Sequence, residues 1–280
     1  MDSVSQSGQL FHIEVMQGIY LISCDTARTP DHGHSLAPGK PTGNSYLVVG
    51  EERALLFDLA ADHPGIRDYA QHLAGKPVQL VLSHGHFDHT FHLNKFSEAW
   101  LHPADEKLIR EGMLGIPPVD PCPLLHPLQD GDTIDLGGRV LDVINIPGHT
   151  HGSILLLDRQ TRTLLSGDTG ARRLLYGSAG LVSLADFCAA LNSLQNREFE
   201  VMYSAHDRCA LPKAHLAHMI RLITEELPKT TKRWSYPGFD EMVWLVHGDP
   251  KCLNYFDMVC PASYFAGKTE YSPAGHHQTV

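Results

Sequence analysis

The sequence feature that most constrains this chain is a run of four metal-capable side chains in six positions, His84-Gly85-His86-Phe87-Asp88-His89. Residues 78–82 directly precede it and form a short apolar run rich in β-forming residues, which predicts a buried strand ending where the cluster begins. Imidazole nitrogens and a carboxylate oxygen suit zinc and its first-row neighbours. Although the chain holds 19 His, chance predicts only roughly 0.006 copies of such a pattern. The run therefore predicts a metal site.

Composition places the chain among ordinary globular proteins, with 42% hydrophobic and 19% charged residues. Its 280 residues lie at the upper edge of one domain, so we expect a single domain over 1–280 with an aromatic-rich C-terminal extension at about 230–280. Residues 234–271 hold nine of the 22 aromatics. This extension could line a pocket, form a homodimer face or pack on the core.

Charge and cysteine content restrict partners and compartment. The formal net charge of -10 argues against nucleic acid, because phosphate binding needs clustered Lys and Arg. Neither a signal peptide nor an apolar run of roughly 18 residues is visible. The six cysteines are scattered without a C-x-x-C pair, which favours reduced thiols. We expect a cytoplasmic enzyme with a small-molecule substrate.

Strand-like and helix-like segments alternate along both halves of the chain, which predicts an α/β fold in which stacked sheets carry helices outside. We expect a four-layer αββα sandwich of two mixed β-sheets. The expected strands are 11–15, 19–23, 45–49, 54–59, 78–82, 99–101, 139–146, 153–158, 162–166 and 199–203. The expected helices are 64–73, 103–110, 184–195 and 212–226.

Three later polar residues follow expected strands in the same way as the first cluster. His149 follows the strand at 139–146, Asp168 follows the strand at 162–166, and His206 follows the strand at 199–203. Ligand sites of α/β sheets gather at the C-terminal ends of strands. The repeated placement predicts that these residues join the first cluster.

With these residues the chain resembles the metallo-β-lactamase superfamily over roughly residues 15–226. The resemblance implies one metal held by His84, His86 and His149 and a second held by Asp88, His89 and His206, with Asp168 bridging both. Asp58 matches an aspartate that would orient the ligands through hydrogen bonds.

The implied chemistry is hydrolysis by two divalent ions, of which zinc is the first expectation and iron or manganese the alternatives. A hydroxide bridging the ions, with Asp88 and Asp168 as the catalytic carboxylates, would attack an ester, thioester or lactone carbonyl. The bridging Asp168 resembles the glyoxalase II and lactonase branches rather than true β-lactamases.

Three other functions stay open. One is a mononuclear iron dioxygenase acting on persulfides, and elemental analysis would distinguish it. Another is a phosphodiesterase or ribonuclease-like hydrolase, against which the acidic charge counts. The third is a binding module without catalysis, although degenerate members of the family usually lose ligands.

Four further residues are candidates for substrate binding: His92, His151, Arg172 and Tyr176. Each also has a plain structural explanation as a surface or supporting side chain. The Pro- and Gly-rich segment 29–43, which carries His32 and His34, predicts a loop that is either an active-site flap or an ordinary surface loop.

Overall fold

The computed structural model describes residues 8–24, 43–177, 182–236 and 239–265. The segment 29–43, with His32 and His34, therefore lies outside the described residues except for Gly43. The same holds for residues 266–280 of the aromatic-rich extension.

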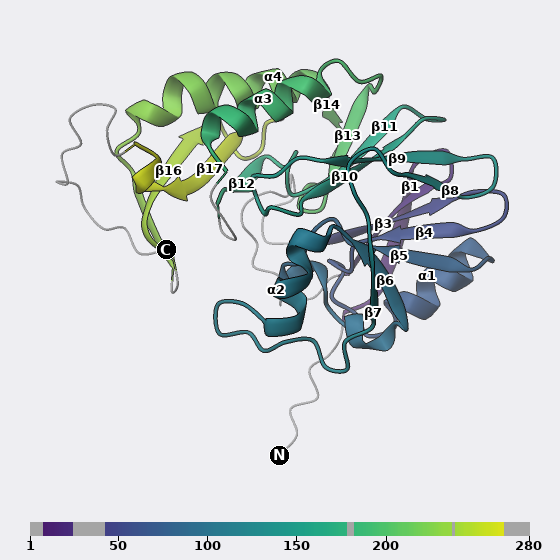
Figure 1. Ribbon diagram of the computed structural model, residues 1–280. Helices are drawn as coiled ribbons and strands as arrows, with labels where there is room; N and C mark the ends of the chain where they lie inside the picture. Colours follow the sequence, from purple (N-terminus) through teal and green to yellow (C-terminus); the bar gives the residue numbers. More distant parts are fainter. Residues whose placement is uncertain (1–7, 25–42, 178–181, 237–238, 266–280) are drawn as a thin grey trace.

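Two β-sheets stack face to face, with helices on both outer sides (Figure 1). The first sheet has the order β1-β2-β3-β4-β5-β6-β7, antiparallel from β1 to β4 and parallel from β4 to β7. Its strands are β1 (Leu10–Met16), β2 (Ile19–Cys24), β3 (Asn44–Val49), β4 (Ala54–Phe57), β5 (Val78–Val81), β6 (Glu98–Leu101) and β7 (Leu124–Pro127).

The second sheet has the order β14-β13-β11-β10-β9-β8, in which β11 and β13 are parallel and the other pairs antiparallel. Its strands are β8 (Thr133–Asp135), β9 (Val140–Asn145), β10 (Ile154–Asp158), β11 (Thr163–Gly167), β13 (Val201–Ser204) and β14 (Leu211–Pro212). Both sheets are thus mixed, and the expected four-layer αββα sandwich is confirmed.

Helices cover the outer faces and close the ends of the strands. Helix α1 (Ile66–Ala74) lies against the first sheet, and α3 (Leu184–Leu194) and α4 (Ala214–Arg221) lie on the opposite side of the sandwich (Figure 1). Helix α2 (Glu106–Glu111) follows β6. Single 3₁₀ turns occupy Phe87–His89, Leu93–Lys95, Pro103–Asp105, Leu227–Lys229 and Ala262–Phe265, and a π-helical turn extends α4 over Leu222–Glu226.

Three apolar cores hold the layers together, and strand alternation assigns residues to them. In β3, Tyr46 and Val48 pack between the sheets, whereas Leu47 packs in the core that contains Ile66 and Ala70 of α1. Both faces of this strand are buried, which explains why its sequence is a continuous apolar run rather than an alternating one. The third core joins the second sheet to α3 and α4.

A third, four-stranded sheet was not expected from the sequence. Its order is β12-β17-β16-β15, formed by β12 (Arg173–Leu175), β17 (Phe256–Pro261), β16 (Phe239–His247) and β15 (Arg233–Tyr236). Leu174 and Met258 pack in the same core as α3 and α4, so this part of the extension adjoins the sandwich. The prediction of a single domain over 1–280 stays a prediction.

The described helices include none that is both long and apolar enough to cross a membrane.

A buried ion pair ties the two large sheets together at one edge. Arg139, at the start of β9 and 4% exposed, donates from Nε and Nη2 to the two carboxylate oxygens of Asp158 at 3.1 and 2.9 Å. Its Nη1 donates to the carbonyl oxygens of Gly18 and Val49, which belong to the first sheet's edge, at 3.3 and 3.0 Å. One guanidinium therefore satisfies groups from both layers of the sandwich.

We predict that Arg139→Leu lowers the free energy of unfolding by about 3–5 kcal/mol, because it leaves the Asp158 carboxylate buried without its cation. The double variant Arg139→Leu/Asp158→Leu should recover much of this loss. Urea denaturation of both variants measures the effect. The control is Arg159→Leu, whose side chain is 58% exposed in its pair with Asp142. An equal loss in that control would contradict the prediction.

Candidate metal centre

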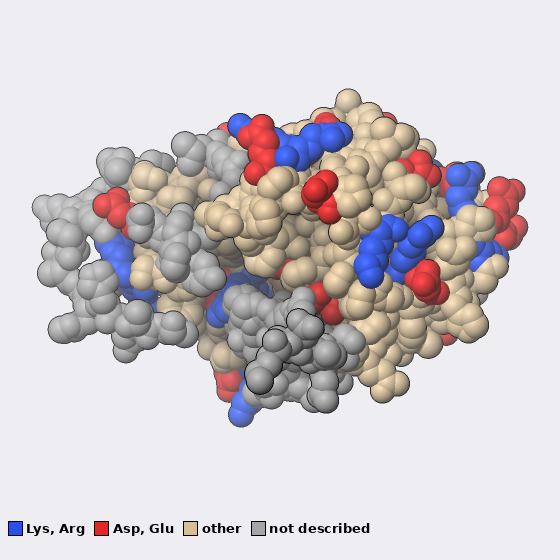
Figure 2. Space-filling view, turned by 90° about the horizontal axis from the view of Figure 1, so that it is seen from below, with Lys and Arg blue, Asp and Glu red and all other residues tan. Residues whose placement is uncertain are grey.

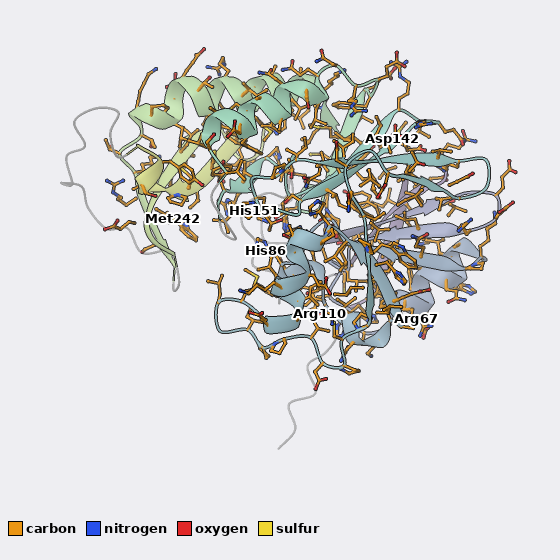
Figure 3. All side chains as sticks on the ribbon, viewed as in Figure 1. Arg67, His86, Arg110, Asp142, His151 and Met242 are labelled. Atoms are coloured by element: carbon orange, nitrogen blue, oxygen red, sulfur yellow. The ribbon has the colours of Figure 1, made fainter. Side chains whose placement is uncertain are left out.

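The seven candidate ligands come together at one end of the sandwich, although they are spread over more than 120 residues of sequence. His84 follows β5, His149 lies between β9 and β10, Asp168 follows β11 and His206 follows β13. Figure 3 labels His86 and His151 at this end, beside the small sheet that carries Met242. Three groups of ligand atoms each lie within 4.8 Å: His84, His86 and His149; His84, His89 and Asp168; Asp88, His89 and His206.

The first group is a set of three buried imidazoles. His149 donates from Nδ1 to the Leu175 carbonyl oxygen at 2.5 Å, which leaves its Nε2 lone pair facing Nε2 of His84 at 3.0 Å. Burial, with neighbouring histidines, lowers the pKa of His84 and His86 well below the usual value. Both rings are therefore neutral near pH 7, as metal ligation requires.

Asp168 lies between the first group and the second. Its Oδ2 is 3.3 Å from Nε2 of His149, while its Oδ1 is 3.1 Å from Nε2 of His89 and 3.2 Å from Nε2 of His206. One carboxylate thus presents one oxygen to each group. The Asp88 carboxylate completes the second group, with Oδ2 3.6 Å from Nε2 of His206.

Unsatisfied polar atoms indicate what this cluster is built to hold. His89 engages Oδ2 of Asp58 through Nδ1 at 2.9 Å, so in the neutral ring the lone pair is on Nε2. Within the described residues, neither His89 Nε2 nor Asp168 Oδ1 has a hydrogen-bond partner of proper geometry, although both atoms are buried. Buried polar atoms are normally satisfied. The nitrogen and oxygen donor set therefore fits divalent metal ions.

The pKa shifts of the second group show how these residues share protons in the absence of an ion. Burial alone lowers the pKa of His89 and of His206, but the surrounding carboxylates, with Asp168 foremost, together raise both above the usual value. Burial alone raises the pKa of Asp168, but the adjacent His206, His89 and His149 hold it well below its usual range. An entering cation must therefore displace protons from the histidines of this group.

Asp58 lies beside the cluster and contacts one of its rings. It follows β4 with a positive φ of 66° and turns its carboxylate toward the cluster. Oδ1 accepts from the Ser83 backbone N–H at 2.6 Å, and Oδ2 contacts His89. Asp58 therefore fixes both the ring of a ligand and the backbone just before His84.

Asp105 was missed in the sequence, yet it joins the two loops that carry the first group. Its carboxylate is 1% exposed: Oδ2 accepts from Gly85 N at 2.9 Å and Thr150 Oγ1 at 2.7 Å, and Oδ1 accepts from Gly152 N at 2.9 Å. A Cβ atom on Gly85 or Gly152 would lie only 2.8 or 2.6 Å from atoms of Asp105. In the sequence Asp105 resembles any acidic residue of a first helical turn, so only the two glycines next to ligands hinted at a close approach.

The prediction that Arg172 and Tyr176 bind substrate is wrong, because both side chains are 0% exposed. Arg172 donates from Nε to Asp207 at 2.6 Å and from Nη1 to two carbonyl oxygens of residues 250 and 252. Tyr176 packs against Phe187 and donates its hydroxyl to a backbone carbonyl. The segment after Asp168 contains strand β12 of the third sheet, and these two buried residues lie directly before and after that strand.

His92 and His151 lie in different surroundings. His92 Nε2 is 3.0 Å from Oδ1 of the buried Asp62, and its ring is 22% exposed. His151 is exposed at the end of the loop that begins with His149. Substrate binding by these two residues stays a prediction.

Comparison with known proteins agrees with this fold. Residues 38–176 match the metallo-beta-lactamase superfamily. Among sequence relatives, the acyl-coenzyme A thioesterase MBLAC2 of Gallus gallus is 34% identical over 45% of this chain and 56% of its own length. The probable metallo-hydrolase YqgX of Bacillus subtilis is 27% identical over 52% of this chain and 72% of its own length. The chain thus spans little more than half the length of the first of these relatives.

Solved structures share the architecture at low identity. A metallo-beta-lactamase from Pontibacter korlensis aligns with a TM-score of 0.59 at 19% identity, covering 78% of this chain and all of that chain. A metallo-beta-lactamase family protein from Thermus thermophilus aligns with a TM-score of 0.54 at 22% identity, covering 76% of this chain and 82% of that chain. This protein belongs to the metallo-beta-lactamase superfamily.

We predict that the affinity for a divalent metal falls as the pH falls from 8 to 6. His89 and His206 have raised pKa values in the metal-free protein, so at lower pH the metal must displace more protons. Each proton displaced weakens binding by up to about tenfold per pH unit. Competition with a chelator of known pH dependence measures this. An affinity that is constant over this range would contradict the proton displacement.

We predict that Asp105→Asn weakens metal binding about 10- to 100-fold, because the amide NH₂ cannot accept from the donors that face it and the two loops lose their common anchor. The matched control is Asp158→Asn, which also alters a buried carboxylate but lies at the far end of β10. The control should lower stability and leave metal affinity unchanged. Chelator competition together with urea denaturation distinguishes the two variants. Equal metal affinity in both would show that Asp105 does not position the ligands.

Proposed function

We propose that this protein is a binuclear metal-dependent hydrolase acting on a carbonyl compound, with a thioester as the first choice and an ester or lactone as the alternatives. The observation that carries the proposal is the position of Asp168, whose two carboxylate oxygens face different groups of histidines. A carboxylate so placed suits two ions rather than one. The choice of thioester rests on the printed name of the MBLAC2 relative.

The side chains divide the work of such a reaction. Bound at the two groups, divalent ions would supply an activated water nucleophile and a Lewis acid for the carbonyl oxygen. Asp58 and the Leu175 carbonyl fix the orientation of His89 and His149, so little reorganisation is needed when a substrate arrives. We assign to Asp88, whose side chain is 24% exposed, the role of taking a proton from the attacking water.

The ligand chemistry favours zinc as the metal, with iron or manganese as alternatives that the same nitrogen and oxygen set accepts. A mononuclear iron persulfide dioxygenase would bind one ion, so the second group of Asp88, His89 and His206 would hold no metal. A phosphodiesterase acting on nucleic acid would use a basic face to bind the phosphates. Figure 2 instead shows Lys and Arg interspersed with Asp and Glu on the described part of the face in view.

The cysteines bear on the compartment in which the protein works. Five cysteines of the described residues, Cys122, Cys188, Cys209, Cys252 and Cys260, have free thiols, which is in keeping with a reducing compartment, and we propose the cytoplasm. The proposed substrate is a small molecule.

We predict that Asp168→Ala removes one or both metal ions and lowers thioester hydrolysis about a thousandfold or more, since a Lewis acid contributes several kcal/mol and each 1.36 kcal/mol is tenfold in rate. Elemental analysis gives the ions per chain, and thiol release from an octanoyl thioester gives the rate. The control is Asp142→Ala, a carboxylate paired with Arg159 at the surface. Undiminished hydrolysis in Asp168→Ala, or a wild-type protein with one iron and oxygen uptake, would overturn the proposed function.

A further inference from the structure

A pocket of about 380 Å³ lies beside the loop that carries the metal ligands. Its walls come from residues 85–94, from α2 and from the segment 112–120 that follows α2. Figure 3 marks α2 by the label of Arg110, close to the label of His86. The volume falls within the range of about 300–1,000 Å³ found for small-molecule sites. The pocket is large enough for part of a substrate.

The walls of the pocket are mainly apolar. They include Phe87, Phe91, Leu108, Met113, Ile116 and Val119. The lining contains neither Lys nor Arg among the described residues. Two of its polar side chains are committed within the protein, since His92 pairs with Asp62 and Asn94 donates to the Asp120 carbonyl at 3.3 Å, and the exposed Asp120 adds an acidic group. Such a pocket suits an uncharged hydrocarbon and gives a phosphate-bearing group no cation.

The pocket and the metal cluster share one loop. Gly85 and Phe87 line the pocket, and they alternate in sequence with the ligands His84, His86 and Asp88. Phe87 is 40% exposed, an unusual exposure for an aromatic ring next to a buried cluster, and its ring meets Phe91 edge to face with centroids 6.1 Å apart. Phe87 therefore lines the pocket from the loop that also carries the cluster, at a point open to solvent.

We propose that this pocket binds the apolar acyl chain of the substrate while the reacting carbonyl lies at the metal cluster, with the Phe87 ring as the contact between them. The inference rests on the proposed acyl hydrolysis and adds a substrate class to it, thioesters or esters of medium-length unbranched acids. The leaving group, which carries any charge, remains outside the pocket. Each methylene taken from water adds about fourfold in affinity.

The experiment compares acetyl and octanoyl thioesters of one thiol in wild-type protein and in Met113→Trp, which fills the pocket. We expect wild type to have the lower KM for the octanoyl compound. Met113→Trp should raise that KM about tenfold or more and leave the acetyl kinetics and the metal content within about twofold of wild type. A preference for octanoyl that survives in Met113→Trp would overturn the proposal.

The matched control is Leu114→Trp, which adds the same ring to the next residue of the same segment. Leu114 is 44% exposed and does not line the pocket. We expect its octanoyl kinetics to match those of wild type. A second filling variant, Ile116→Trp, keeps the test decisive in the event that Met113→Trp does not fold. A loss of octanoyl preference in Leu114→Trp as large as in the filling variants would count against the pocket.

A titration with 1-octanol separates failure of the pocket from failure of the proposed function. Metal-loaded wild-type protein should bind 1-octanol in calorimetry, and Met113→Trp should bind it at least about tenfold more weakly. One outcome is that wild type binds 1-octanol and Met113→Trp does not, while wild type does not hydrolyse the thioester. That outcome would overturn the proposed reaction and support the alkyl pocket. Equal 1-octanol binding in wild type and Met113→Trp would overturn the pocket whatever the thioester result.

Discussion

Five buried histidines gather with the less deeply buried carboxylates of Asp88 and Asp168 at one end of a β-sandwich, and the rest of this structure depends on this constraint. A buried charge or unpaired imidazole is costly unless a partner compensates it. Here Asp168 lies between His149, His89 and His206, while Asp58 and the Leu175 carbonyl hold the outer nitrogens of two rings. The third sheet has a part in this arrangement, because Leu175 is the last residue of β12. A divalent metal ion would complete the compensation.

Hydrogen bonds also join the two large sheets at this end of the molecule. Asp105 accepts from the loop after β5, in the first sheet, and from the loop before β10, in the second. Backbone hydrogen bonds add to this joint: Ile154 N donates to Ser83 O at 2.8 Å, and Asn44 N donates to Ala205 O at 2.9 Å. Ligands from different sheets therefore share a rigid support, which is what a catalytic metal site requires. Stability and ligand geometry depend on the same contacts.

The proposed division of the substrate follows from the chemistry on either side of the loop 84–89. One side presents nitrogen and oxygen donors, and the other presents apolar walls without a cation. A carbonyl compound with a hydrocarbon chain matches both sides at once, whereas a phosphodiester matches neither the apolar walls nor the interspersed charges in Figure 2. In the loop 84–89, residues of the metal cluster alternate with residues that line the pocket. The cluster and the pocket therefore lie within a few residues of each other in the sequence.

The sequence by itself determined the αββα sandwich and the members of the cluster, because strand patterns and ligand types are local properties of the chain. The position of each ligand after an expected strand was enough to bring His84, Asp168 and His206 together. Only the tertiary structure decided the third sheet, whose β12 pairs with residues more than 80 positions later and carries no strand signal in three residues. That pairing turned Arg172 and Tyr176 into the interior. It also took the tertiary structure to find Asp105 and the apolar pocket, since both arise where segments distant in sequence meet.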